Sequence, residues 1–227
     1  MSGSAVVIGA GGGIGAALLD AVRDEGSHDA VHAFDRSTLD ITDEAQVRAV
    51  AARVADGPAP TLVLIATGML HDADHGPEKS LSEIDADWMA RSFQVNAIGP
   101  ALVIKHLLPL LPKGDRAVIA ALSARAGSIG DNRMGGWHSY RAAKAALNMI
   151  IKGAAIEAAR TRPRAIIVGL HPGTVDTRLS KPFQGNVRAG GLFTPDRAAM
   201  QLLDVLDGLK VPDSGGVFAW DGTPIPA

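Results

Sequence analysis

The chain of 227 residues contains no cysteine, which excludes a disulfide framework, a thiolate-ligated zinc site and a cysteine nucleophile. It carries little net charge, −2 at pH 7, so its electrostatics give no reason to expect nucleic acid or an anionic membrane as a partner. It also lacks an apolar run of the ~18 residues that a membrane helix needs. Its first residues lead directly into an apolar run, without the charged region and cleavage site of a signal peptide, so we expect a cytoplasmic protein.

The sequence has a single tyrosine, Tyr140, but an excess of glycine. Its 26 glycines are about 11% of the chain, against a usual ~7%. No Gly-X-Y period accounts for them, so the excess must lie in particular loops. The hydrophobic fraction of 47% and the charged fraction of 20% are ordinary for a folded protein with a sizeable core. Because the chain has neither repeats nor a linker, we predict one domain over residues 1–227.

Short apolar runs alternate along the chain with longer stretches of helical periodicity. Most runs are apolar at odd and even positions alike, as in strands buried on both faces of a parallel sheet. The predicted strands are Ala5–Ile8, Ala30–Phe34, Thr61–Ile65, Ala117–Leu122, Ile166–Leu170 and Gly216–Ala219. The predicted helices cover residues 14–22, 42–54, 82–111, 139–160 and 195–206. This alternation predicts the α/β class, a doubly wound parallel sheet of Rossmann type in three layers.

The first predicted strand ends in a glycine-rich turn, and the first helix follows at once. Glycines let a backbone turn tightly and approach a pyrophosphate closely, and the N-terminus of the helix offers free N–H groups. A tight turn of any α/β protein is the alternative explanation. The position between a strand and an amphipathic helix favours dinucleotide binding. The candidate residues are Gly9, Gly11, Gly13, Ile14 and Gly15.

Two further strand ends are candidates for cofactor binding. Asp35 follows the second strand, 20 residues after Gly15, where an acid can hydrogen-bond an adenosine ribose. Arg36 beside it could instead hold a 2′-phosphate, so NAD and NADP both stay open, with a slight preference for NAD. Asp40 lies where the next loop could pass the adenine. The third strand ends in Ala66-Thr67-Gly68, a small turn that permits close approach.

Tyr140 and Lys144 are four residues apart in a helical stretch, which places them on one face. An unperturbed phenol has a pKa of ~10, too high for easy proton exchange at neutral pH. A neighbouring ammonium favours the phenolate and is expected to lower that pKa. The pair is therefore a candidate acid and base for interconverting a carbonyl and an alcohol, and the lysine could also hold the nicotinamide ribose. On spacing alone, a surface cation beside a half-buried aromatic is the commoner explanation.

Four motifs occur in one order along the chain. They are Gly9-x-x-x-Gly13-x-Gly15, Val95-Asn96-Ala97, Tyr140-x-x-x-Lys144 and Pro172-Gly173-Thr174-Val175-Asp176-Thr177. With these motifs the chain resembles the short-chain dehydrogenase/reductase family. It is most similar to the C-factor-like branch, through residues 127–132, 140–148, 171–177 and 218–222. The resemblance implies an enzyme, an NAD(P)-dependent oxidoreductase that moves a hydride between the cofactor and a carbonyl or secondary alcohol.

The resemblance also implies a role for each motif. Tyr140 would be the acid/base, Lys144 would lower its pKa and bind the ribose, and Asn96 would hold a water that links the lysine to solvent. The nicotinamide would be bound by Pro172, Gly173, Val175 and Thr177, the last two on its carboxamide. The family further implies a small carbonyl or alcohol substrate and a homodimer or homotetramer.

The sequence departs from the family pattern at the residue that binds the substrate oxygen. Alignment on Gly127 places Ala124 where the family has a serine. Ser123 is our candidate replacement, although successive strand residues face opposite sides, so a bulge or a one-residue shift would be needed. A missing hydrogen bond to the developing oxyanion could cost on the order of 10²–10³ in rate. The family's asparagine-containing turn after the third strand is also replaced, here by Ala66-Thr67-Gly68.

Weaker hypotheses concern two loops and two other functions. His71, Asp72, Asp74 and His75 could suggest a metal, but they lie in one loop, so we expect a solvated polar loop without metal. Residues 178–193 are expected to form a mobile lid over the substrate, or a disordered loop. A dinucleotide-binding regulatory protein with little turnover is the alternative function. A methyltransferase that uses S-adenosylmethionine would share the glycine-rich turn but gives no reason for Tyr140, Lys144 and the Pro172-Gly173 turn to occur together.

Overall fold

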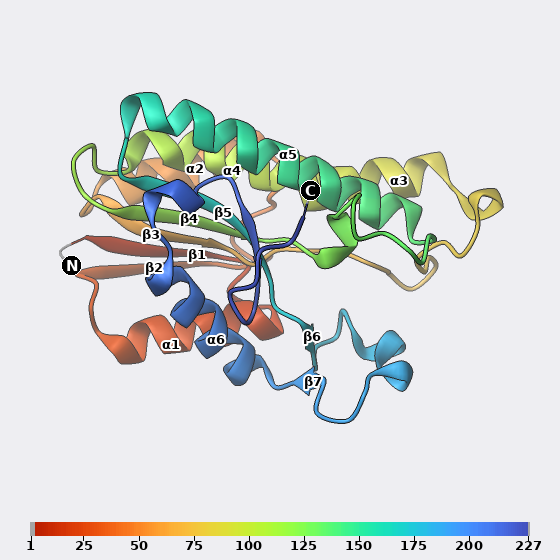
Figure 1. Ribbon diagram of the computed structural model, residues 1–227. Helices are drawn as coiled ribbons and strands as arrows, with labels where there is room; N and C mark the ends of the chain where they lie inside the picture. Colours follow the sequence, from red (N-terminus) through yellow and green to blue (C-terminus); the bar gives the residue numbers. More distant parts are fainter. Residues whose placement is uncertain (1–2, 227) are drawn as a thin grey trace.

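The computed structural model describes residues 3–226 and confirms the predicted fold class. In chain order the elements are β1 (Ser4–Ile8), α1 (Gly13–Glu25), β2 (Ala30–Phe34), α2 (Glu44–Ala55), β3 (Pro60–Ile65), α3 (Ala86–Phe93), α4 (Gly99–Leu107), β4 (Ala117–Leu122), α5 (His138–Thr161), β5 (Ala165–His171), β6 (Thr174–Val175), β7 (Leu192–Phe193), α6 (Pro195–Gly208) and β8 (Val217–Ala219). A parallel sheet lies between two layers of helices, with α2, α4 and α5 on one face and α1 and α6 on the other (Figure 1). Among the described residues, no helix combines the length and apolarity needed to span a bilayer.

The order of the strands brings the carboxyl ends of β1 and β3 side by side. The six-stranded sheet has the order β2-β1-β3-β4-β5-β8, and every neighbouring pair is parallel. The chain leaves β1 for β2 on one side and then crosses to β3 on the other, so the winding reverses between β1 and β3. Open parallel sheets bind ligands beyond the carboxyl ends of the strands at such a reversal. The fold therefore locates a site at the turns that follow β1 and β3.

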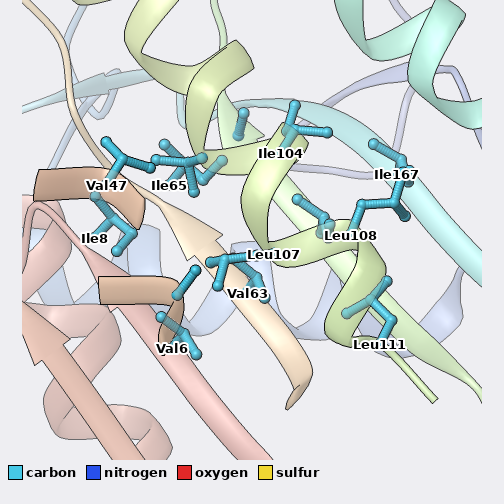
Figure 2. Packing of buried hydrophobic residues seen from close by; sticks show 14 of the residues in the cluster. Val6, Ile8, Val47, Val63, Ile65, Ile104, Leu107, Leu108, Leu111 and Ile167 are labelled. Atoms are coloured by element: carbon cyan, nitrogen blue, oxygen red, sulfur yellow. The ribbon is translucent and has the colours of Figure 1, made fainter. Parts of the chain in front are cut away.

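Successive side chains of each central strand point to opposite faces of the sheet. Figure 2 shows Val6 and Ile8 of β1 beside Val63 and Ile65 of β3, packed with Leu107 of α4. The intervening residues of the same strands pack against α1 and α6 instead. Because both faces are buried, the strands are apolar at both odd and even positions, as their sequences predicted.

The helical stretch predicted over residues 82–111 is interrupted. Between α3 and α4 the helix widens into one π-helical turn, Gln94–Ile98, and the N–H of Gly99 bonds the carbonyl five residues before it. The following Pro100 has no N–H, so an α-helical hydrogen bond is missing at this place. Such wide turns are frequent at functional sites, and this one carries Asn96.

The segment 178–193 leaves the main sheet. It contains a 3₁₀ helix, Lys181–Asn186, and ends in β7, which pairs in parallel with β6 as a separate small sheet. Figure 1 shows β6, β7 and this segment projecting from the rest of the molecule. The two short strands were not predicted, because two residues are too few to give a periodic pattern.

Candidate active site

The turn between β1 and α1 leaves no room for side chains. An added Cβ at Gly15 would lie 2.1 Å from the Gly9 carbonyl oxygen, and one at Gly13 would lie 2.7 Å from Cγ2 of Thr177. No side chain among the described residues caps the N-terminus of α1, so its first N–H groups are available to a ligand. A close-packed glycine turn that leads into an uncapped helix fits the phosphates of a dinucleotide.

Asp35 presents an ionised carboxylate to this turn. Its Oδ1 accepts hydrogen bonds from the hydroxyl and the N–H of Ser37, at 2.6 and 2.9 Å. These bonds, with weaker ones from Thr38, hold the pKa of the Asp35 carboxyl below its usual range. Its Oδ2 lies 3.5 Å from the position of an added Cβ at Gly11, so the second oxygen faces the glycine turn. Arg36 is exposed beside it.

Asp40 organises the loop before α2. Its Oδ1 accepts hydrogen bonds from the hydroxyl and the N–H of Thr42, at 2.7 and 2.9 Å, and these bonds lower the pKa of its carboxyl. Its own N–H donates to Oε1 of Gln46 at 2.9 Å. These contacts give Asp40 a structural role, and its contact with adenine stays a prediction.

The turn after β3 meets the glycine turn directly. An added Cβ at Gly9 would lie 2.9 Å from the carbonyl carbon of Ala66 and 3.1 Å from Cγ2 of Thr67. The hydroxyl oxygen of Thr67 is buried and has no hydrogen-bond partner among the described residues. A buried hydroxyl of this kind needs an explanation, and a ligand in the adjoining turn supplies one. Gly68 continues the turn toward Lys144, whose Nζ lies 3.9 Å from the position of an added Cβ.

The segment Pro172–Thr177 closes another side of the glycine turn. Gly173 has a φ of +76°, and an added Cβ would lie 2.8 Å from the ring of Phe193, so only glycine fits there. Val175 is buried with Phe193 in a small cluster, and Ile14 packs against that cluster. The structure thus brings the predicted nicotinamide-binding residues beside the predicted phosphate-binding residues.

Tyr140 and Lys144 lie on successive turns of α5, and the side chain of Lys144 is almost completely buried. Its Nζ donates a hydrogen bond of 2.8 Å to the carbonyl of Leu122, at the end of β4, and lies 5.7 Å from the centre of the Tyr140 ring. Gly127 lets the connection after β4 approach this helix, because an added Cβ there would lie 2.7 Å from the carbonyl carbon of Lys144. The pair therefore sits at the carboxyl edge of the sheet.

Burial dominates the pKa values of both groups. It raises the pKa of Tyr140 to about 12 and lowers the pKa of Lys144 to about 7. The expected lowering of the phenol pKa by the ammonium does not appear here, because removal from water disfavours the charged form of each group and is the cause of both shifts. Near neutral pH the phenol is protonated, and the lysine loses its positive charge as the pH rises through about 7.

Asn96 is completely buried on the π-helical turn, and its carboxamide is occupied by protein groups. Its Oδ1 accepts from the N–H of Met69 at 2.9 Å, and its Nδ2 donates to the Met69 carbonyl at 2.8 Å and to Oγ of Ser92 at 3.1 Å. An added Cβ at Gly68 would lie 3.6 Å from Asn96 Oδ1, close to Lys144. The structure thus brings Asn96 to the lysine but leaves no amide hydrogen for a water.

The hydroxyl of Ser123 is bonded to a protein group, which lends no support to the role predicted for it. The Ser123 side chain follows the alternation of side chains along β4 and points to α5. There its hydroxyl donates a hydrogen bond of 2.6 Å to Oδ1 of Asn148. Asn148 lies about two helical turns beyond Tyr140. The pairing of β4 with β5 is regular up to Leu122, so the alternation of β4 leads into Ser123 without a shift. The neighbouring Ala124 carries no hydroxyl, and the oxyanion partner expected at this place is missing.

The loop His71–His75 is held by its own hydrogen bonds. Oδ1 of Asp72 accepts from the N–H groups of Asp74 and His75, at 2.9 and 2.8 Å. Within residues 3–226 no three or more His, Cys, Asp or Glu side chains are grouped as they would be to hold a metal ion. His71 instead contacts the predicted lid, with its Nε2 3.2 Å from the carbonyl oxygen of Leu179.

Three aromatic rings from separate segments form a row of contacts that starts at Tyr140, and none of them was predicted as a catalytic or cofactor-binding residue. The Trp137 ring lies edge-on to Tyr140, with centroids 6.3 Å apart, and packs on Phe183 of the predicted lid at 5.2 Å. The His71 ring lies edge-on to Phe183, with ring centroids 5.7 Å apart. Glu78 was not predicted either, and its buried side chain contacts the first turn of α5. These contacts join residues far apart in the chain, which spacing cannot reveal.

Comparisons with known proteins agree with this geometry. The sequence profile of the family described as short chain dehydrogenase matches residues 27–187. C-signal of Myxococcus xanthus is 35% identical over 181 residues, which cover 79% of this chain and 99% of that protein. The 1-hydroxy-2-glutathionyl-2-methyl-3-butene dehydrogenase of Rhodococcus sp. (strain AD45) is 33% identical over 186 residues, 82% of this chain and 76% of that protein. NADPH-bound carbonyl reductase from chicken fatty liver has a TM-score of 0.79 at 25% identity and covers 99% of this chain and 98% of its own.

Proposed function

The chain belongs to the short-chain dehydrogenase family and is an NAD(P)-dependent oxidoreductase acting on CH–OH and carbonyl groups, and from this premise we propose that Tyr140 moves the proton of its reaction. The observation that carries the proposal is the pair of Tyr140 and the buried Lys144 at the carboxyl end of β4, next to the turn after β3. When bound, the dinucleotide supplies or accepts the hydride. A regulatory protein with little turnover is not favoured.

The phenol of Tyr140 serves as acid in one direction and as base in the other. In reduction its O–H donates a proton to the carbonyl oxygen of the substrate while the carbonyl carbon gains the hydride, which leaves an alcohol and a phenolate. In oxidation the phenolate takes the alcohol proton back. A phenol is protonated near neutral pH even at its ordinary pKa, and burial raises that pKa further, so Tyr140 carries the proton that reduction requires.

Lys144 stabilises the phenolate. Its ammonium has three N–H groups, and the Leu122 carbonyl takes one of them. The others are available to the phenolate oxygen and to the ribose of the cofactor. A positive charge at this distance favours the phenolate, so the lysine acts only while it is protonated.

Asn96 supports the return of the proton from solvent. Its side chain braces Met69, so we assign the relay water to the main-chain carbonyl of Asn96 rather than to its amide. In an α-helix that carbonyl would accept from residue 100, but Pro100 has no N–H to donate. The π-helical turn thus frees this acceptor from its usual partner, on the helix that faces Lys144.

NAD is the proposed cofactor. The free oxygen of Asp35 faces the glycine turn and would accept hydrogen bonds from ribose hydroxyls. The same ionised carboxylate would repel the 2′-phosphate of NADP. Arg36 is exposed next to Asp35 and leaves this carboxylate facing the glycine turn. The hydroxyl of Thr67 and the segment Pro172–Thr177 would hold the other end of the dinucleotide.

The substrate would be a small aldehyde, ketone or secondary alcohol bound between Tyr140 and the segment 178–193, which we propose to be a lid. Ser180 anchors this segment by donating hydrogen bonds to the carbonyls of Val175 and Thr177. Phe183 covers Trp137 next to the phenol, so the lid must move for substrate to enter. The rings favour a substrate with an apolar group beside its carbonyl.

We further propose a homodimer or homotetramer that works in the cytoplasm. The exposed apolar side chains of Met149 and Ile156 on α5 are suited to burial against a second copy.

A cofactor-dependent screen tests the proposed activity. Purified protein is mixed with NADH or NADPH and a panel of aldehydes and ketones, and the absorbance of the reduced nicotinamide is followed. We expect turnover with NADH that Tyr140→Phe abolishes. A thermal-shift titration without substrate is the control, and no response to either dinucleotide would refute cofactor binding.

A further inference from the structure

The backbone that leads into α5 is unusual. Three successive residues, Gly135, Gly136 and Trp137, have φ of +64°, +61° and +52°, all in the left-handed region. Trp137 is the one non-glycine residue of the described chain with positive φ. A side chain with a Cβ disfavours this conformation, so surrounding contacts must hold Trp137 in it.

Those contacts come from Glu78, in the loop between β3 and α3. Its main-chain carbonyl accepts a hydrogen bond of 2.5 Å from the N–H of Trp137. An added Cβ at Gly136 would lie 3.1 Å from the same carbonyl oxygen, so the close approach itself requires glycine there. The loop and the start of the helix are therefore fitted to each other.

The carboxylate of Glu78 completes the contact. The side chain is buried, with 3% of its surface exposed, and Oε1 accepts a hydrogen bond from the Ser139 hydroxyl. Both carboxylate oxygens lie 3.3 Å from the N–H of Ser139. Trp137 at the N-cap position offers no side-chain acceptor, so Glu78 takes the place of a cap residue from 61 residues away in the chain. A negative charge also suits the positive end of the helix.

Tyr140 follows Ser139 directly. We propose that Glu78 is a positioning residue: by fixing Ser139 and Trp137 it holds the first turn of α5, and with it the phenol of Tyr140 in register with Lys144. This inference rests on the proposed role of Tyr140. Glu78 contacts neither the substrate position nor Lys144 and takes no part in the chemistry.

The test compares three variants of the full chain. Glu78→Ala removes both acceptors, and Glu78→Gln keeps an oxygen that accepts from Ser139. Glu83→Ala is the matched control, because Glu83 is exposed in the same region and its side chain accepts a hydrogen bond only from the N–H of Lys79 among the described residues. We expect Glu78→Ala to lower kcat by about 10²-fold while the Kd for the dinucleotide stays unchanged, since small misplacements of a catalytic group are costly. Glu78→Gln should recover most of the loss, and Glu83→Ala should behave like the native protein.

A second readout does not depend on activity. Tyr140 is the sole tyrosine, so an ultraviolet pH titration reports its phenol alone. If Glu78 holds the first turn, Glu78→Ala should lower the phenol pKa from about 12 toward ~10 as the ring gains access to water. A residue that merely stabilised the fold would lower the melting temperature and leave this titration unmoved.

The outcomes separate this inference from the proposed function. Native kcat and a native phenol titration in folded Glu78→Ala would overturn the positioning role, even if Tyr140→Phe is inactive. Full turnover in Tyr140→Phe would refute the proposed function, while a shifted titration in Glu78→Ala would still support the contact. If Glu78→Ala does not fold, Ser139→Ala replaces it and should give a smaller loss of kcat in the same direction. Native behaviour of Ser139→Ala in both measurements would then count against the proposal.

Discussion

The side-chain nitrogen of Lys144 donates a hydrogen bond of 2.8 Å to the main-chain carbonyl of Leu122, in a place almost closed to water. This bond is stronger to the ammonium than to the neutral amine, but one carbonyl does not offset the cost of burying the charge. Burial accordingly lowers the pKa of Lys144 to about 7. The charge that is proposed to stabilise the Tyr140 phenolate is therefore lost as the pH rises through neutrality.

The first prediction is that reduction slows above about pH 7. Below this pH the ammonium is present and the phenol is protonated, and above it the lysine becomes neutral. We expect kcat/KM for reduction to fall as the pH rises from about 7 to about 9, which is measured with initial rates across that range. Lys144→Arg is the control, because a guanidinium stays charged and should remove the decline even if the rate is lower. A flat native profile would contradict the assignment.

The second prediction concerns Tyr140. Tyr140→Phe removes the hydroxyl and keeps the ring, so turnover should fall by at least ~10²-fold, the usual size of a general acid contribution. The dinucleotide Kd, measured by fluorescence, should stay nearly native because the phosphate turn is untouched. Comparable turnover in the variant would show that another group moves the proton.

A third prediction follows from the position of Ser123. Since its hydroxyl bonds Asn148, Ser123→Ala should leave kcat/KM nearly unchanged and lower the free energy of unfolding by about 1 kcal/mol. Ala124→Ser restores a hydroxyl at the place where the family pattern has one, and it should raise kcat/KM by roughly 10-fold to 10²-fold if that hydroxyl reaches the oxyanion. Steady-state kinetics and urea unfolding check both changes. A large loss of rate in Ser123→Ala would return the serine to the catalytic site.

The fourth prediction tests the preference for NAD. Asp35→Ser removes the carboxylate that faces the glycine turn, and it should weaken NADH binding by about tenfold, the value of a hydrogen bond to a charged group. NADPH binding should improve, because the repulsion of a 2′-phosphate is gone. Arg36→Ala is the companion variant and should leave NADH binding nearly unchanged. Tighter native binding of NADPH than of NADH would refute the proposal.

Local patterns predicted those parts of the molecule that local forces decide. β2 and β4 have the predicted bounds, because short apolar runs between helical stretches are typical of strands in a parallel sheet. β4 is buried along nearly its whole length, whereas β2 lies at the edge of the sheet and is mostly half-buried. The glycine turn was found because close backbone approach leaves few other choices of residue. The pairing of Tyr140 with Lys144 followed from helical spacing.

The unpredicted parts depend on contacts between distant segments. Glu78 meets Ser139 across 61 residues, and nothing in either neighbourhood indicates the other. The packing of Phe183 on Trp137 likewise depends on how the segment 178–193 folds back toward the start of α5. The raised pKa of Tyr140 was not predicted because the sequence gives the neighbours of a residue but not its burial, and burial causes this shift.

The fifth prediction concerns stability in mild acid. His171 lies at the end of β5, where burial, and then the charge of Arg125, lowers the pKa of its ring to about 4, while Asp221 opposes this more weakly. In the unfolded chain the pKa is ~6.5, so between the two values the unfolded state binds a proton that the folded state does not. The contribution of His171 to the free energy of unfolding is therefore fully present above about pH 6.5 and is lost as the pH falls through 4.

We expect His171 to account for about 2 kcal/mol of the free energy of unfolding lost between about pH 7 and pH 5. Urea unfolding of the native protein and of His171→Asn at both pH values measures this difference. The other histidines are common to the two proteins, so their titration cancels in the comparison. The asparagine variant should lose less of its free energy of unfolding on acidification than the native protein. An equal loss in both would mean that protonation of the His171 ring costs no free energy in the folded state.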